Sequence, residues 1–221
     1  MSSTRIRRVG RKTGPKPRFT REDVINAAVE LGIDRFTLGA VAAKLGIATS
    51  AMYRLFDSRD ALVDACLAQA AAEIGMIMLD DELPWPELLR NWAETTWNIC
   101  EKYPGLDITI FQYTQSFSHV RGFTQHAMGI LMAQGFARSE ALFALDFIGD
   151  TVLATHIGMS AMRHSPEGMD IVRRTITELS AETLLDNKDH WNAQRGFLDA
   201  KVEFIIAGLR QQLGQRATEK T

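Results

Sequence analysis

Residues 37–59 have the sequence TLGAVAAKLGIATSAMYRLFDSR. Thr37 precedes an apolar helical face and can accept a hydrogen bond from a free N–H group at the start of the helix. Gly46 follows this face, at a point where helices commonly end in a left-handed residue. The sequence therefore predicts a helix over residues 38–45. Its apolar residues recur at i, i+3, i+4 and i+7, the spacing of one buried face: Leu38, Val41, Ala42 and Leu45.

A second short helix is predicted to begin near Thr49, after a tight turn at Ile47 and Ala48. Two short helices joined by a tight turn containing glycine form a helix-turn-helix, which sets one helix in the major groove of DNA. The inward face of the second helix is formed by Met52, Leu55 and Phe56. Its start and its outer side are formed by Thr49, Ser50, Ala51, Tyr53 and Arg54.

The surrounding sequence, residues 19–64, resembles the DNA-binding domain of the TetR family of bacterial regulators. Three positions depart from the pattern of the family. Ala48 stands where a capping Ser is usual, which makes Thr49 the alternative cap. Leu55 replaces a common His, and Gly39 replaces a larger polar residue that can reach DNA. The matching segments follow one another in the order and at the distances of the family: 19–25, 36–38, 41–47, 52–56 and 58–62.

The exposed residues of the motif are assigned roles on DNA. Thr49, Ser50 and Ala51 are expected to face base edges, where the Ala51 methyl group suits the methyl group of thymine. The resemblance implies that Tyr53 donates its hydroxyl to a phosphate. Plain solvent exposure is the alternative for Lys44 and Arg54. Further phosphate contacts are predicted at Thr37, Lys44, Arg54 and Arg59.

The first 18 residues are basic and have no helical periodicity. They predict a disordered arm, residues 1–18, that lies along DNA phosphates or enters the minor groove. A solubilising tail is the alternative. The first 21 residues contain eight basic residues and no acidic one, so the total charge of −2 leaves about −10 for the rest of the chain. The basic residues of the arm are Arg5, Arg7, Arg8, Arg11, Lys12, Lys16 and Arg18.

Helical periods continue to the end of the chain, without an alternating strand pattern of useful length. We expect an all-α protein with a three-helix helix-turn-helix domain over 19–64. A helical bundle for ligand binding and dimerisation follows over 65–214, and a polar tail over 215–221. The predicted caps are Thr20 with Asp23, Ser58 and Ser139. The predicted helices, besides those of the motif, span about 20–31, 59–79, 86–102, 106–116, 119–134, 139–163, 166–185 and 191–213.

Two of these helices, 139–163 and 191–213, have apolar stripes that are broader than the surface of a monomer requires. An intramolecular core is the simpler interpretation. The resemblance implies that both helices pair with their copies in a four-helix dimer interface. The predicted interface residues are Leu142, Leu145, Val152, Leu198, Val202, Ile205 and Leu209.

Aromatic and methionine side chains alternate with polar ones between residues 86 and 163. Most such residues fill a core, but a buried polar side chain needs a partner, which a ligand could supply. The lining suits an apolar or aromatic small molecule. The candidate ligand-binding residues are Trp92, Thr96, Phe111, Gln115, His119, His126, Met128, Met132, Asp150 and His156.

The sequence lacks the motifs of enzymes and metal proteins. It has no Glu-x-x-His pair, no His-Glu-x-x-His, no phosphate-binding glycine loop and no Gly-x-Ser-x-Gly. The five histidines do not have metal-ligand spacing, although His119 and His126 could share a helix face. Asp146 and Asp150 are more typical of a solvated or dimer-rim face than of paired catalytic acids. We therefore expect no cofactor, no metal and no enzymatic activity.

Cys66 and Cys100 lie in apolar helical runs and are predicted to be buried thiols, as in a reducing cytoplasm. No run approaches the roughly 18 apolar residues of a membrane span, and the basic start lacks the apolar core of a signal peptide. We expect a cytoplasmic homodimer that binds double-stranded DNA and a small-molecule effector. Repression is the usual mode in the family. The alternative makes the bundle a protein-binding or purely dimerising module.

Overall fold

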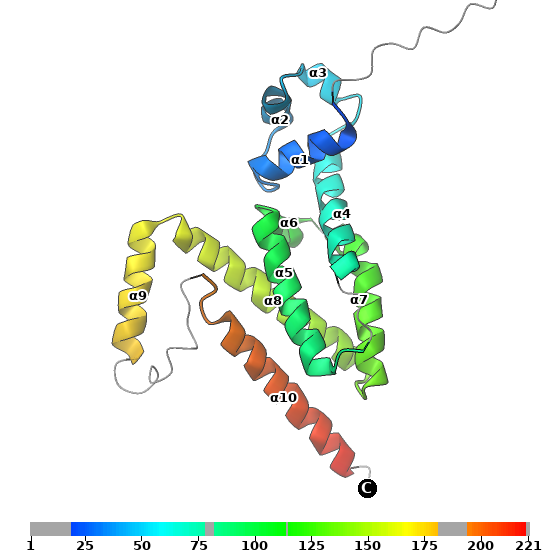
Figure 1. Ribbon diagram of the computed structural model, residues 1–221, viewed down its shortest axis with the longest axis vertical. Coiled ribbons are helices and arrows are strands. Elements are labelled where there is room, and N and C mark those ends of the chain that lie inside the picture. Colours follow the sequence, from blue (N-terminus) through cyan, green and yellow to red (C-terminus); the bar gives the residue numbers. More distant parts are fainter. Residues whose placement is uncertain (1–18, 78–81, 114, 181–193, 220–221) are drawn as a thin grey trace, which may run out of the picture.

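The computed structural model describes residues 19–77, 82–113, 115–180 and 194–219. Every regular element in these residues is a helix, as the sequence predicts (Figure 1). The elements are α1 (Arg21–Leu31), α2 (Leu38–Leu45), α3 (Thr49–Met52), α4 (Arg59–Ile77), α5 (Trp85–Lys102), α6 (Leu106–Gln112), α7 (Ser116–Ala133), α8 (Arg138–Arg163), α9 (Pro166–Ser180) and α10 (Leu198–Glu219).

The first helices begin and end where local chemistry predicts. At the start of α1, the backbone N–H of Asp23 donates to Thr20 Oγ1 over 3.1 Å, and the N–H of Thr20 donates to the Asp23 carboxylate over 2.7 Å. This capping box satisfies two N–H groups that lack partners within the helix. Gly32 ends α1 at φ 94°. Thr37 caps α2 by accepting from the N–H of Ala40, and Ser58 caps α4 by accepting from the N–H of Ala61.

Helix α4 joins the first three helices to the rest of the molecule (Figure 1). Its buried residues Leu62 and Cys66 belong to a core that also holds Val24 of α1 and Phe56 after α3. The same core continues into α5, α6 and α8, where it includes Leu153. The proposed boundary at residue 64 therefore lies within a continuous helix and a continuous core.

Helix α8 is the centre of the bundle and packs against α5, α6, α7, α9 and α10. By length and composition alone it is apolar enough to cross a membrane, although the sequence analysis found no such run. Its apolar side chains instead belong to the core: Leu145, Ile148 and Val152 are at most 1% exposed and pack with residues of α5, α7 and α10.

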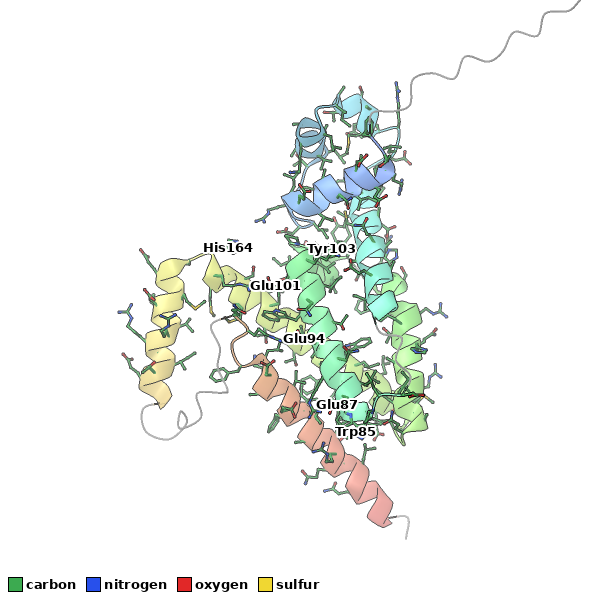
Figure 2. The ribbon with its side chains drawn as sticks, viewed as in Figure 1. Trp85, Glu87, Glu94, Glu101, Tyr103 and His164 are labelled. Carbon is green, nitrogen blue, oxygen red and sulfur yellow. The ribbon has the colours of Figure 1, made fainter. Side chains whose placement is uncertain are left out.

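Helix α5 has acidic residues that recur every seven positions along one face, and two of these three pair with arginines outside the helix (Figure 2). Glu87 and Glu203 of α10 both bind Arg90, Glu94 binds Arg195, and Glu101 binds Arg163 at the end of α8. Exposed pairs of this kind contribute about 0–1 kcal/mol each. They orient the helices more than they stabilise them.

Several helix bounds differ from the prediction. Helix α6 ends at Gln112 and not near residue 116, and α7 begins at Ser116 and not near residue 119. The carboxylate of Glu140 accepts from the N–H of Ala137 over 2.9 Å, so α8 begins at Arg138 and Ser139 does not cap it. The last helix begins at Leu198, after a turn in which Gly196 has φ 61°, and not near residue 191. It also continues to Glu219, through most of the predicted tail. The predicted helix ends at 79 and 185 lie outside the described residues.

Candidate DNA-binding surface

Helices α2 and α3 form the predicted helix-turn-helix. Gly46 ends α2 with φ 65° and ψ 33°, a left-handed conformation that glycine adopts without steric cost. Helix α3 is one turn long, and the N–H groups of Leu55 and Phe56 still donate to the carbonyl of Met52. Met52 and Phe56 are buried, which fixes the outer face of α3. The predicted cap by Thr49 is wrong, because Ala48 holds the N-cap position and no side chain caps α3.

Most of the predicted DNA contacts are exposed on this motif. Thr49, Ser50 and Arg54 are exposed, Tyr53 is 54% exposed, and Ala51 is half-buried. Figure 1 places α2 and α3 at the end of the molecule that lies farthest from α10. The surface is therefore free of contacts with the bundle.

Lys44 of α2 and Thr37, the N-cap residue of this helix, have partners within the chain. Lys44 pairs with Glu30 of α1, with 2.7 Å between Nζ and Oε2. The pair is exposed, so solvent screens it and a phosphate can compete for the ammonium group. Thr37 Oγ1 accepts from the N–H of Ala40, which leaves its hydroxyl proton for a phosphate. Both side chains are available to DNA without refolding.

Arg59 lies in a different place from the one expected of a phosphate contact. Its Nε donates to the carbonyl of Phe36 over 3.0 Å, and its Nη2 donates to the carbonyls of Ile33 and Asp34 over 3.2 and 2.9 Å. Its Nη1 donates to Tyr113 Oη over 2.8 Å. The guanidinium group is thus used to hold the loop between α1 and α2 against α4. We do not include Arg59 in the DNA surface.

Tyr113, which follows α6, completes a junction between the bundle and the DNA-binding helices. Its hydroxyl accepts from Arg59 and donates to Asp60 Oδ1 over 3.0 Å. A second contact lies nearby, where the N–H of Ile33 donates to the carbonyl of Pro104 over 2.8 Å. These hydrogen bonds join the end of α6 and the α5–α6 turn to α4 and the α1–α2 loop.

We predict that Arg59→Ala lowers the free energy of unfolding by about 2–4 kcal/mol, because three carbonyls lose a charged donor. Urea unfolding of this variant and of Arg54→Ala measures the effect. Arg54 is exposed, so its variant is expected to remain within about 0.5 kcal/mol of the parent protein. If Arg59 contacts phosphate instead, the unfolding curve will not move and the salt dependence of DNA binding will weaken.

The ten candidate ligand residues are not gathered around one cavity. Met128 and Met132 line an open groove on α7, and His156 lines another at the junction of α5, α6 and α8. Trp92 is buried in the core, and Thr96 donates to the carbonyl of Trp92. The other candidates line none of the larger grooves formed by the described residues: Phe111, Gln115, His119, His126 and Asp150.

Two of the candidate histidines pair with carboxylates that the sequence analysis did not select. His119 Nε2 lies 2.7 Å from Asp64 Oδ1 of α4, and His156 Nδ1 lies 2.6 Å from Asp107 Oδ2 of α6. Burial raises the pKa of the Asp107 carboxyl, but hydrogen bonds from His156 and the Ile108 N–H outweigh burial and lower it. Both partners are remote in sequence, so spacing could not reveal them.

Six of the seven predicted dimer residues are buried within the chain. The apolar stripes of α8 and α10 face the core of the same chain, because each helix is packed against the bundle on that side. Only Leu142 is exposed, at 50%. The six that are buried within the chain are Leu145, Val152, Leu198, Val202, Ile205 and Leu209.

A different apolar face of α8 and α10 points outward. Phe143, Phe147 and Phe204 are 55%, 46% and 82% exposed. An open groove of about 550 Å³ runs between the two helices. The residues that line it are Phe147, Thr151, Ala154, Thr155, Ala200, Lys201, Phe204 and Ile205.

Both cysteines are buried and free, as predicted. Burial raises the pKa of the Cys66 thiol to about 12 and also raises that of Cys100. A thiol that stays protonated is a poor nucleophile and a poor metal ligand. Within the described residues, no group of three or more His, Cys, Asp or Glu side chains is placed to hold a metal ion.

Comparison with known proteins finds a family model that matches the helix-turn-helix segment. Residues 25–66 match the family model of the N-terminal domain of bacterial regulatory proteins of the tetR family. This segment contains the α2–turn–α3 motif together with most of α1 and the start of α4. A search of curated proteins found no significant match to the sequence.

Solved structures share the fold of nearly the whole chain. Apo ActR from Streptomyces coelicolor is 16% identical, covers 91% of this chain and 100% of its own, and has a TM-score of 0.69. ActR in complex with (S)-DNPA is 16% identical, with coverage of 87% and 98% and a TM-score of 0.61. A TetR variant from Acinetobacter baumannii AYE in complex with minocycline is 20% identical, with coverage of 88% and 98% and a TM-score of 0.58.

At these identities the solved structures establish the fold alone, whereas the family model covers the segment that forms the helix-turn-helix. The two findings agree with the geometry of α1–α3 and the attached helical domain. The N-terminal domain of this chain is that of the tetR family of bacterial regulatory proteins, and nearly the whole chain has the fold of solved TetR-family regulators.

Proposed function

We propose that this regulator is a cytoplasmic repressor. It binds a pseudo-palindromic operator as a homodimer and is released by an apolar or aromatic small molecule. The observation that carries the proposal is that the described residues of one chain contain a single exposed helix-turn-helix, together with an exposed aromatic face on α8 and α10. One motif reads one half-site, and a two-fold dimer supplies the second.

The aromatic face fits a second copy of this chain better than it fits solvent. Phe204 is 82% exposed and borders the groove between α8 and α10, in which Ala154 and Ala200 leave room for a close neighbour. Two copies related by a two-fold axis would each place Phe204 against the α8–α10 face of the other. Burial of aromatic side chains dominates the energy of such interfaces.

On DNA, α3 of each protomer would enter a major groove. Ser50 and Thr49 would face base edges, and the methyl group of Ala51 would contact a thymine methyl group. Tyr53, Arg54, Lys44 and Thr37 would bind phosphates. The basic arm, residues 1–18, lies outside the described residues, and we propose that it follows the phosphates beside the motif.

The junction around Tyr113 supports a switch. An effector that moves α6 or α8 would act on Arg59 through Tyr113, and Arg59 holds the α1–α2 loop. A coupling free energy of about 1–3 kcal/mol between effector and operator is typical of allosteric proteins. It requires only that the effector bind one arrangement of the dimer better than the other.

The alternative is a bundle that dimerises or binds a protein without any small-molecule effector. The dispersed positions of the ten candidate ligand residues favour it. The complexes of related proteins with (S)-DNPA and minocycline favour a small-molecule effector. A screen of small molecules for a raised melting temperature together with release of operator DNA separates the two. Release without a thermal shift would not support an effector that binds this protein.

The DNA roles are tested by two substitutions. Tyr53→Phe removes the hydroxyl that would contact a phosphate. We expect the affinity for every DNA sequence to fall by a similar factor, about three- to tenfold. Ser50→Ala is expected to change the preference at one operator position and to leave binding to random DNA unchanged. Fluorescence anisotropy with the operator, its single-base variants and random duplex measures both. A Tyr53→Phe variant with altered sequence preference would mean that the roles are assigned wrongly.

A further inference from the structure

Helices α1–α3, which we call the DNA-binding head, meet the bundle at the turn between α5 and α6. In Figure 1 the end of α5 and helix α6 lie below α1, and Figure 2 shows Tyr103 at this end of α5. Ile33 and Phe36 of the α1–α2 loop share one core with Tyr103 and Leu106, and each of these side chains is at most 3% exposed. The head therefore contacts the bundle at a second place besides its covalent connection through α4.

Main-chain groups hold the loop on this turn. The N–H of Ile33 donates to the carbonyl of Pro104 over 2.8 Å. On the α4 side, the guanidinium group of Arg59 donates to the carbonyls of Ile33 and Asp34 and to the hydroxyl of Tyr113, which belongs to the bundle. A main-chain group cannot rotate away from its partner as a side chain can, so these bonds restrict sliding of the loop along the turn.

Gly105, at the centre of the turn, has no room for a side chain. It has φ 81° and is the N-cap residue of α6. A Cβ atom at this position would lie 2.0 Å from Asp34 Oδ1 and 2.8 Å from the backbone nitrogen of Asp34, and real Cβ atoms have essentially no contacts shorter than 3.0 Å. The carboxylate could rotate away, but the backbone nitrogen could not. A side chain at position 105 would therefore push the loop off the turn.

The side chain of Asp34 does not explain this close approach. Its Oδ1 is buried without a hydrogen-bond partner. A buried acceptor is normally paired, because it has lost its bonds to water. The surrounding main-chain bonds and the shared core, rather than the carboxylate, thus set the position of the loop.

Attachment at two places restricts how the head can move. A head joined through α4 alone could tilt, whereas the contact at the α5–α6 turn fixes its orientation on the bundle. On DNA, one added base pair between two half-sites moves them apart by about 3.4 Å and rotates one against the other by about 35°. Two rigid heads cannot follow such a change, and two loosely attached heads can.

We propose that the contact between the α1–α2 loop and Gly105 determines which half-site spacing the dimer accepts. Gly105 is then a specificity-determining residue that does not touch DNA and acts by positioning the head. The proposal rests on the proposed function, because it requires a dimer on an inverted repeat. It deepens that function by adding selection for spacing to selection for base sequence.

Gly105→Ala tests the contact, and Gly135→Ala is its matched control. Both glycines have positive φ, 81° and 101°, so alanine strains the backbone at either position. A Cβ atom at position 135 would meet no atom of the described residues within 4 Å, chain neighbours and its own helix aside. The pair thus separates the contact from the strain. Tyr113→Phe is a milder second variant, since it removes only the hydroxyl between Arg59 and Asp60.

The DNA probe is the inverted repeat that the parent protein selects from random duplexes, with one or two base pairs added to or removed from its centre. We expect each changed base pair to weaken binding by the parent about tenfold or more, because the DNA must deform to fit rigid heads. In Gly105→Ala this factor is expected to fall to about threefold or less. Tyr113→Phe should lie between the two, and Gly135→Ala should match the parent. Base preference within each half-site should stay the same in all variants.

A measurement without DNA follows the heads directly. Glu22 is exposed on α1, and both native cysteines are buried, so a nitroxide label can be attached to Glu22→Cys alone. Electron spin resonance then gives the distribution of distances between the two labels of the dimer. We expect a single narrow distribution in the parent protein and in Gly135→Ala, and a broader one in Gly105→Ala.

A folded Gly105→Ala variant with the spacing preference and the narrow distribution of the parent would overturn the proposal. Equal broadening in Gly135→Ala, or a parent protein that accepts all spacings, would also overturn it. If Gly105→Ala does not fold, an unchanged spacing preference in Tyr113→Phe would have the same meaning. A parent protein that binds no inverted repeat as a dimer would instead contradict the proposed function, so the two failures can be told apart.

Discussion

Phe204→Asp is expected to convert the protein from a dimer into a monomer at micromolar concentration. In a two-fold interface each substitution occurs twice, so two carboxylates would replace two aromatic side chains on the face of α8 and α10. Like charges and lost apolar contacts in an interface cost several kcal/mol, and each 1.4 kcal/mol weakens association about tenfold. Operator affinity is expected to fall by about a hundredfold or more, because a monomer reads a single half-site.

The fold of the monomer should survive this substitution, since the side chain of Phe204 is 82% exposed and contributes little to the core. Light scattering measures the mass, and circular dichroism checks the helix content. Phe111→Asp is the matched control, because Phe111 is 54% exposed but lies on α6, away from this face. A Phe204→Asp variant that remains dimeric, with full operator affinity, would show that another surface joins the protomers.

Deletion of residues 2–17 is expected to weaken operator binding strongly and to flatten its dependence on salt. The deletion removes Arg5, Arg7, Arg8, Arg11, Lys12 and Lys16 from each protomer. Each basic residue that neutralises a phosphate contributes about 0.9 to the slope of log K against log salt. If most of these residues contact DNA, the slope per protomer should fall by about 4–5.

A matched variant separates charge from length. Replacing the same six residues by Gln keeps the length and should reproduce the loss, whereas shuffling the order of residues 2–17 keeps the charge and should restore most of the slope. Melting temperatures should remain equal in all three variants, because the arm contributes nothing to the predicted core. An unchanged slope after deletion would mean that the arm is a solubilising tail.

The parts of the fold that depend on neighbouring residues could be predicted from the sequence. Thr20 with Asp23, Thr37 and Ser58 cap their helices because each hydroxyl needs only an N–H group three residues away. Gly46 ends α2 because glycine, which has no Cβ atom, adopts the left-handed conformation without steric cost. These local rules, together with apolar periodicity, were sufficient for the helix-turn-helix and for an all-α bundle.

The parts that depend on remote residues could not be predicted. Arg59 follows the motif as a phosphate contact would, but its donors bind carbonyls of residues 33–36, which a sequence pattern cannot place. The pairing of Asp107 with His156 joins α6 to α8 across 49 positions. Neither contact has a signature in spacing, because tertiary packing alone brings the groups together.

In α8 and α10, the periodic pattern of apolar residues could not show which apolar face packs inside the chain. Each helix has two apolar faces, and the more regular stripe, which includes Leu145 and Val202, packs inside the chain. The outward face has fewer apolar residues, and Asp146 and Asp150 interrupt it on α8. Burial and the charge of Asp146 raise the pKa of Asp150, which indicates a crowded acidic pair. Hydrophobicity summed over a helix cannot tell these two faces apart.

The central claim is that a dimer of this regulator reads an inverted repeat, and selection of DNA from a random pool tests it most directly. The full-length protein is bound to random duplexes, and the retained fragments are sequenced after several rounds. We predict enrichment of a pseudo-palindrome whose half-sites lie one helical turn apart or a multiple of it, about 34–36 Å per turn. Absence of enrichment, or a single half-site without symmetry, would contradict the account.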